Sequence, residues 1–248
     1  MLLDNGDPQD LWREYAASAE DDRVPFARRL GIHALAKLAP TQDSELLNLE
    51  AGAGSFAIAA STVVRRVVAV EDWPSEFSKL EARTSKMPNV VLVRAASDAL
   101  PFRNERFSRA MCAIAGDIRL ERGRLFRELR RVLSSDGNAA VVVWSEVHRA
   151  SEQPSADLGW PRGQLEQAGL RVDDISGISW ELESPCIADF ERTREAWVRT
   201  RLDPRRAEIL QRLDGAFAEA GDHDRPVQLR LNAAIYVVSP VHYREAPS

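Results

Sequence analysis

Two glycines and one acidic residue stand where a turn and a carboxylate could bind a ligand together. Gly52 and Gly54 follow the run Leu46–Leu49, and Glu71 follows the next apolar run, Val67–Val70. Glycine adopts positive φ without strain and lets backbone N–H groups approach a ligand closely. A helix that begins just after such a turn favours a carboxylate or a phosphate, and an acid after the second strand suits the hydroxyl groups of a ribose. The spacing therefore indicates a site for a nucleoside-containing ligand.

These residues lie between short apolar runs that alternate with helical patterns. The runs predict strands at 46–49, 67–70, 90–93, 109–115 and 139–144. Apolar spacing predicts helices at about 25–38, after Gly54, at about 75–86 and at about 125–133. Such alternation is typical of βαβ units and a parallel sheet. Ligands of open parallel sheets bind beyond the carboxyl ends of the strands, where the strand order reverses. The glycine turn and Glu71 both lie at such ends.

The chain beyond residue 145 shows a looser pattern. We expect a loop at 149–162, a short helix at about 165–168, a strand near 170–182 and a closing strand at 227–238. Helices are predicted at about 188–199 and 204–219. This organisation predicts an acidic lead-in at 1–24 and a single domain at 25–248, with a helical insertion at about 188–219, since α/β folds of this length often form one domain.

Composition narrows the classes of partner and location. The 248 residues carry a net charge of −5, which disfavours a dedicated nucleic-acid surface. We expect no metal site, because the four histidines are dispersed. The start of the chain does not resemble a signal peptide, and no apolar run is long enough to span a membrane. We therefore expect a cytoplasmic protein without membrane partners. The oligomeric state stays open.

The glycine turn fits a second cofactor as well. Gly52 and Gly54, followed by Ala57, satisfy the dinucleotide fingerprint G-x-G-x-x-G/A. On this motif alone, a nicotinamide-dependent oxidoreductase is an alternative.

Four segments carry a resemblance to a known family. LLNLEAGAGSFA, VVAVEDW, SDALPFRNERFSRAMCAIA and FRELRRVLSSDGNAAVVVW follow one another between about 44 and 146. Together they resemble class I S-adenosylmethionine-dependent methyltransferases, and most of all the ubiquinone-biosynthesis-like enzymes that act on small molecules. The resemblance continues through LEQAGLRVDDI and RLNAAIYVV. The run Asp98–Phe102 has no counterpart at this place in dehydrogenases, so it favours the methyltransferase over the nicotinamide enzyme.

The resemblance implies a fold, a cofactor and a set of binding residues. The fold is Rossmann-like α/β, with a mostly parallel seven-stranded sheet, helices on both faces and a terminal antiparallel strand pair. The cofactor is S-adenosylmethionine, and the reaction is methyl transfer to a small-molecule substrate. The turn would approach the methionine part, Glu71 the ribose, and the remaining residues the adenine. The expected cofactor-binding residues are Glu50, Ala51, Gly52, Gly54, Glu71, Asp72, Ser97 and Asp98.

The glycine turn also departs from the family pattern of an acid followed by three alternating glycines. One alignment, which we prefer, has Asn48 for the acid and Glu50 for the first glycine. A second makes Glu50 the acid and Phe56 the last glycine. Further departures are Ala96 and Ser108, each at a usual acid, and Ser135–Gly137 at a usual Pro-Gly-Gly-like turn. They support, as an alternative, a catalytically silent binding or regulatory protein of the same fold.

Glu50 and the general base are the open chemical questions. A carboxylate at Glu50 would repel the carboxylate of the cofactor, or would bind its ammonium group. Under the preferred alignment, Glu50→Gly should strengthen cofactor binding, and weaker binding would favour the ammonium interpretation. Asp117 and His148 follow strands four and five and are positioned as general bases. No catalytic residue is assigned, since solvated loop residues are common at such places.

Overall fold

The computed structural model describes residues 26–115, 122–144, 148–149, 159–182 and 229–241. Its helices are α2 (Phe26–Leu38), α3 (Ser55–Ser61), α4 (Pro74–Thr84), α5 (Gly123–Val132) and α6 (Pro161–Gln167). Its strands are β1 (Glu45–Leu49), β2 (Arg66–Val70), β3 (Val90–Val93), β4 (Phe107–Ala115), β5 (Leu133–Trp144), β6 (His148–Arg149), β7 (Leu170–Leu182) and β8 (Leu229–Pro240). The predicted lead-in at 1–24 and the predicted helices at 188–199 and 204–219 lie outside the described residues.

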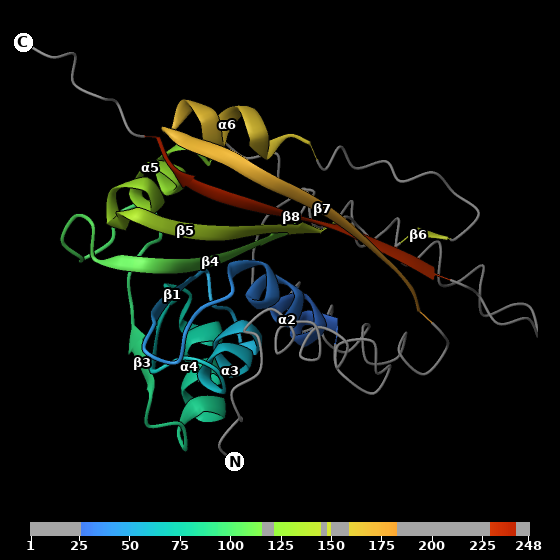
Figure 1. Cartoon of the computed structure of the whole chain (residues 1–248). Coiled ribbons are helices and arrows are strands. Elements are labelled where there is room, and N and C mark those ends of the chain that lie inside the picture. The colour runs from blue at the N-terminus through green and yellow to red at the C-terminus, as the bar shows by residue number, and fades with distance from the viewer. Residues whose placement is uncertain (1–25, 116–121, 145–147, 150–158, 183–228, 242–248) are drawn as a thin grey trace, which may run out of the picture.

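The strands form one mixed sheet in the order β3-β2-β1-β4-β5-β8-β6, and β7 pairs with β8 (Figure 1). Strands β1 to β5 are parallel, whereas β8 is antiparallel to β5, β6 and β7. The predicted parallel sheet with a terminal antiparallel pair is confirmed, and the two-residue β6 adds a short further strand. The strand order reverses between β1 and β4, which places the expected ligand position at their carboxyl ends.

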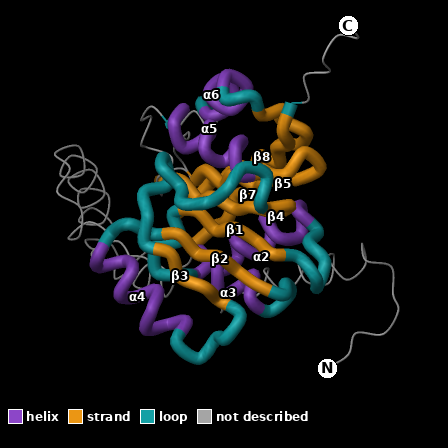
Figure 2. The backbone as a smooth tube through the Cα atoms, turned by 90° about the vertical axis from the view of Figure 1, so that its left-hand side faces the viewer, coloured by secondary structure: helices purple, strands orange, loops and turns teal. Residues whose placement is uncertain are grey.

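Helices cover both faces of this sheet, as the sequence predicted (Figure 2). Successive residues of a strand point to opposite faces, so Leu46 packs in a core with α2 and α3, while Leu47 packs in a second core with α5. Leu80 of α4 belongs to the first core, and Leu165 of α6 belongs to the second. The alternation explains why these strands read as nearly continuous apolar runs.

The entry into β5 differs from the sequence prediction. The strand was predicted at 139–144, but β5 already begins at Leu133. Leu133 pairs with Phe107, and the next pair joins Asn138 to Arg109, so the intervening residues form an irregularity within the strand. Phe107 is fully buried, which explains why pairing of β4 also begins before the predicted residue 109. Pairing with β4 thus holds both ends of the irregular segment between Leu133 and Asn138.

Candidate functional site

The turn after β1 carries three alternating residues with positive φ. The φ angles are 49° at Glu50, 53° at Gly52 and 88° at Gly54. Ala51 continues the strand pairing, since its N–H donates to the Val70 carbonyl at 3.0 Å. The backbone therefore has the conformation that suits glycine at all three positions, and Glu50 occupies the first of them. This agrees with the alignment that places Glu50 at the first glycine of the family pattern.

The two glycines of the turn are needed for different reasons. A Cβ atom at Gly54 would lie 2.6 Å from Leu80 Cδ1, so a larger residue there would require the Leu80 side chain of α4 to shift. A Cβ atom at Gly52 would meet no atom within 4 Å. The Gly54 position is therefore crowded by Leu80, whereas the Gly52 position borders open space in which a ligand could approach the backbone.

The Glu71 carboxylate is joined directly to this turn. Oε2 accepts a hydrogen bond from the Gly52 N–H at 2.8 Å, and Oε1 accepts bonds from the N–H groups of Asp72 and Trp73 at 3.0 Å each. The Glu71 residue is only 3% exposed, while Asp72 and Trp73 are exposed. The predicted pairing of turn and acid is thus present in the structure.

Glu50 reaches two residues that follow other strands. Its Oε1 atom accepts hydrogen bonds from Arg122 Nη1 at 2.8 Å and from Ser97 Oγ at 3.0 Å. The side chains of Arg122 and Glu50 are 16% and 20% exposed. Sequence reasoning placed Ser97 at this site but missed Arg122, which immediately precedes α5. No motif marks Arg122, because only the neighbouring positions of β1 and β4 bring the segment before α5 towards Glu50.

Cys112 is affected by the charges of this ion pair. It is fully buried in β4, and its register partner in β1 is Leu49. Burial raises the pKa of the Cys112 thiol, the negative charge of Glu50 raises it further, and Arg122 lowers it. The thiol therefore stays protonated near neutral pH and has little nucleophilic character.

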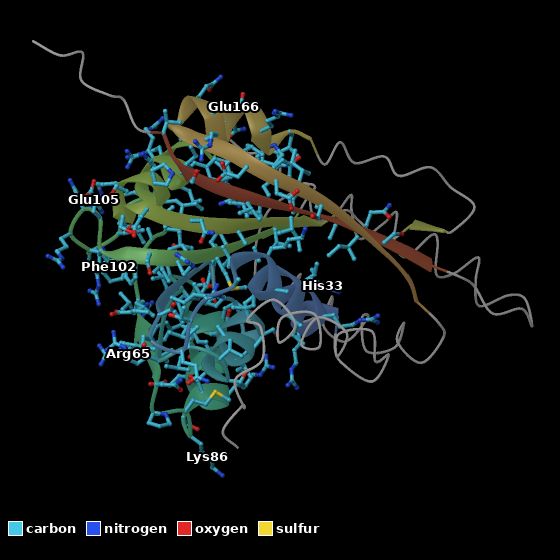
Figure 3. The ribbon with its side chains drawn as sticks, viewed as in Figure 1. His33, Arg65, Lys86, Phe102, Glu105 and Glu166 are labelled. Carbon is cyan, nitrogen blue, oxygen red and sulfur yellow. The ribbon has the colours of Figure 1, made fainter. Side chains whose placement is uncertain are left out.

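The segment between β3 and β4 is anchored from α5. The Leu100 N–H donates to Glu128 Oε2 at 2.7 Å, and Arg131 donates to the carbonyl oxygens of Leu100 and Phe102. Phe102 and Glu105 both belong to this segment (Figure 3). These contacts fix the loop that carries Ser97.

Asp98, also predicted to bind the cofactor, is placed differently. Its carboxylate lies 3.8 Å from the guanidinium of exposed Arg124, and this ion pair joins it to α5. The structure therefore brings Ser97 to Glu50, whereas Asp98 pairs with an exposed arginine of α5.

The candidates for a general base remain untested predictions. Asp117 lies outside the described residues, and for His148 only the backbone in β6 is described. Within the described ranges, no group of three His, Cys, Asp or Glu residues could hold a metal ion. None of the helices in the same ranges is long and apolar enough to cross a membrane.

Comparisons with known proteins agree with this geometry. Residues 47–141 match the family model described as a methyltransferase domain. No curated protein matches the sequence. Among solved structures, YcgJ from Bacillus subtilis has a TM-score of 0.61 at 18% identity, over 86% of this chain and 98% of that one. The [4+2]-cyclase SpnF has a TM-score of 0.63 at 17% identity, over 96% of this chain and 98% of that one.

A third structure, a SAM-dependent methyltransferase from Aquifex aeolicus, has a TM-score of 0.53 at 18% identity, over 69% of this chain and 92% of that one. The resemblance to class I S-adenosylmethionine-dependent methyltransferases is confirmed by the family match and by the fold. Its assignment to the ubiquinone-biosynthesis-like group stays a prediction. Because one neighbour is named as a cyclase, the fold by itself does not determine the reaction.

Proposed function

We propose that the chain binds S-adenosylmethionine at the glycine turn and transfers a methyl group to a small-molecule acceptor. The observation that carries this proposal is the 2.8 Å hydrogen bond from the Gly52 N–H to the Glu71 carboxylate. It places an acid beside an open backbone turn at the reversal of the strand order, the arrangement that suits a nucleoside. The methyltransferase-domain match over residues 47–141 includes both residues.

The residues present fit this cofactor. Gly52 borders open space, so the turn is not closed against a ligand. The Glu50 side chain accepts hydrogen bonds from Ser97 and Arg122, which lie after other strands. Glu71 would hold the ribose hydroxyl groups, and the turn would lie against the methionine part. These assignments retain the ligand orientation that the resemblance implies.

The protein would contribute to the reaction mainly by positioning the cofactor and the acceptor. When bound, S-adenosylmethionine supplies a methyl group on a sulfonium, which is already a good leaving group. The glycine turn and Glu71 would hold the nucleoside so that an acceptor atom attacks in line, and the surrounding apolar side chains would exclude water. An acceptor hydroxyl group would also need a general base.

Isothermal titration calorimetry with S-adenosylmethionine tests the binding step. We expect a dissociation constant of micromolar order for the native protein, which corresponds to roughly 8 kcal/mol. Glu71→Gln should raise it at least about tenfold, because a charge-assisted hydrogen bond is lost. Glu81→Gln, which changes an exposed acid on α4, is the matched control and should have no effect. Absence of heat at millimolar ligand would exclude the proposal, and a thermal shift with NADH instead would favour the oxidoreductase.

A second candidate is a binding or regulatory protein that holds the cofactor without turnover. It is favoured by one observation, namely that the first glycine position of the turn carries Glu50 in an ion pair with Arg122. S-adenosylmethionine with an isotopically labelled methyl group, incubated with a metabolite extract and the protein, separates the two. Label appearing in small molecules with native protein but not with Glu71→Gln supports methyl transfer. Binding without label transfer supports the silent protein.

A further inference from the structure

We propose that Arg122 and Glu50 recognise the two charges of an amino-acid group on the ligand. The Arg122 guanidinium would bind the carboxylate, and the Glu50 carboxylate would bind the ammonium group. This inference rests on the proposed function and extends it, because it assigns Arg122 as a residue that determines cofactor specificity.

The first argument is position. Glu50 directly follows β1, and Arg122 directly precedes α5, the helix that follows β4 in the chain. Strands β1 and β4 are neighbours at the point where the strand order reverses, and Leu49 is in register with Cys112. The ion pair therefore lies at the edge of the sheet where open α/β proteins bind their ligands.

The second argument is the hydrogen-bonding capacity of the pair. The hydrogen bonds from Ser97 and Arg122 to Glu50 both use Oε1. A guanidinium carries five N–H donors. Within the described ranges, Arg122 Nη1 donates to Glu50, whereas Arg122 Nε is buried and has no hydrogen-bond partner. A buried donor without a partner is costly. A ligand carboxylate could satisfy it in the bidentate geometry that guanidinium groups favour.

The third argument is charge. An isolated Glu50 would repel a ligand carboxylate, but Arg122 Nη1 lies 2.8 Å from Oε1 and compensates the charge. A paired cation and anion are complementary to an amino-acid zwitterion, which also carries one charge of each sign. The structure therefore favours the ammonium interpretation of Glu50. It reverses the expectation from the sequence, so Glu50→Gly should weaken cofactor binding.

Two nucleosides that differ at the amino-acid end provide the test. S-adenosylhomocysteine carries the zwitterion, whereas 5′-methylthioadenosine retains the adenosine and sulfur but lacks it. Measured by calorimetry, Arg122→Gln should weaken the binding of S-adenosylhomocysteine about 10- to 100-fold, which is the range for the loss of a hydrogen bond to a charged group. Binding of 5′-methylthioadenosine should be unchanged. Arg127→Gln, at an exposed arginine of α5, is the matched control and should alter neither affinity.

Further variants guard against a merely structural effect. Arg122→Lys should restore part of the affinity for S-adenosylhomocysteine, and Glu50→Gln should lower that affinity without changing 5′-methylthioadenosine binding. Equal weakening of both nucleosides by Arg122→Gln would overturn the inference, as would unchanged or tighter binding of S-adenosylhomocysteine. If the native protein binds 5′-methylthioadenosine and S-adenosylhomocysteine equally well, this inference fails while the nucleoside site stands. If it binds neither, the proposed function fails, and this inference fails with it.

Discussion

The Gly52 N–H donates to the Glu71 carboxylate across 2.8 Å, and this bond ties the turn after β1 to the end of β2. The same carboxylate accepts the N–H groups of Asp72 and Trp73. Three backbone donors from two loops thus converge on one buried acid. Glu71 therefore stabilises the shape of the site in addition to its proposed role in holding the ribose.

Glu71→Gln should lower the free energy of unfolding by about 1–3 kcal/mol, since the amide replaces a charged acceptor and one of its NH₂ donors faces backbone N–H groups. Urea unfolding followed by circular dichroism measures this change. Glu81→Gln serves as the control and should stay within about 0.5 kcal/mol of the native protein, as is usual for exposed positions. Equal stability of Glu71→Gln and the native protein would show that the three hydrogen bonds contribute little.

Alanine at the two glycines of the turn should have unequal effects. Gly54→Ala should lower the free energy of unfolding by about 2–4 kcal/mol, because its Cβ atom overlaps Leu80 and the positive φ is strained. Gly52→Ala should cost only about 1–2 kcal/mol from backbone strain, since its Cβ atom meets no neighbour. Thermal and urea unfolding of both variants compare them directly. Equal losses would contradict the packing role of Gly54.

Glu105 offers a test of backbone strain away from the site. Its φ is 54°, its side chain is exposed, and its N–H donates to the Arg131 carbonyl at 2.9 Å. Glu105→Gly should raise the free energy of unfolding by about 1 kcal/mol by relieving the left-handed conformation. Glu105→Ala removes the same side chain without that relief and should bring no such gain. A similar gain from both variants would indicate that charge, rather than φ, is responsible.

Glu128 gives a prediction about pH. The side-chain hydrogen bond from Arg131 lowers the pKa of Glu128, and the bond from the Leu100 N–H lowers it further, although burial raises it. The unfolded chain binds more protons than the folded chain between the lowered and the ordinary pKa, so stability rises with pH in that window. Glu128→Gln should therefore destabilise the protein near pH 7.

The difference between the native protein and Glu128→Gln should shrink as the pH falls below the ordinary glutamate value of about 4.3. Urea unfolding at pH 7 and at pH 3 measures it. A difference that stays constant would show that the Glu128 charge is not coupled to folding. Hydrogen exchange of the Leu100 amide should rise in the same variant, because that N–H loses its charged acceptor.

The sequence by itself determined the elements and the edge of the sheet at which the site lies. The runs at 46–49, 67–70 and 90–93 predicted strands that the structure places at those residues. Strands β1 and β2 are buried, and buried parallel strands are apolar on both faces. The two glycines and Glu71 were predictable for a related reason, since turn chemistry and the end of a strand are local features. The alternation of periods predicted a parallel sheet of βαβ units, and the resemblance implied helices on both of its faces.

Only the tertiary structure decided the partners of the charged groups. Arg122 stands 72 positions from Glu50, and Glu128 stands 28 positions from Leu100. No local pattern links residues at such separations, because strand order and helix packing decide which loop ends meet. The positive φ of Glu50 was also not predictable, because a glutamate side chain does not indicate a left-handed backbone conformation. The glycine turn and the acid of the candidate site were thus predictable from local sequence. The pairing of Glu50 with Arg122 depends on the packing of β1 beside β4.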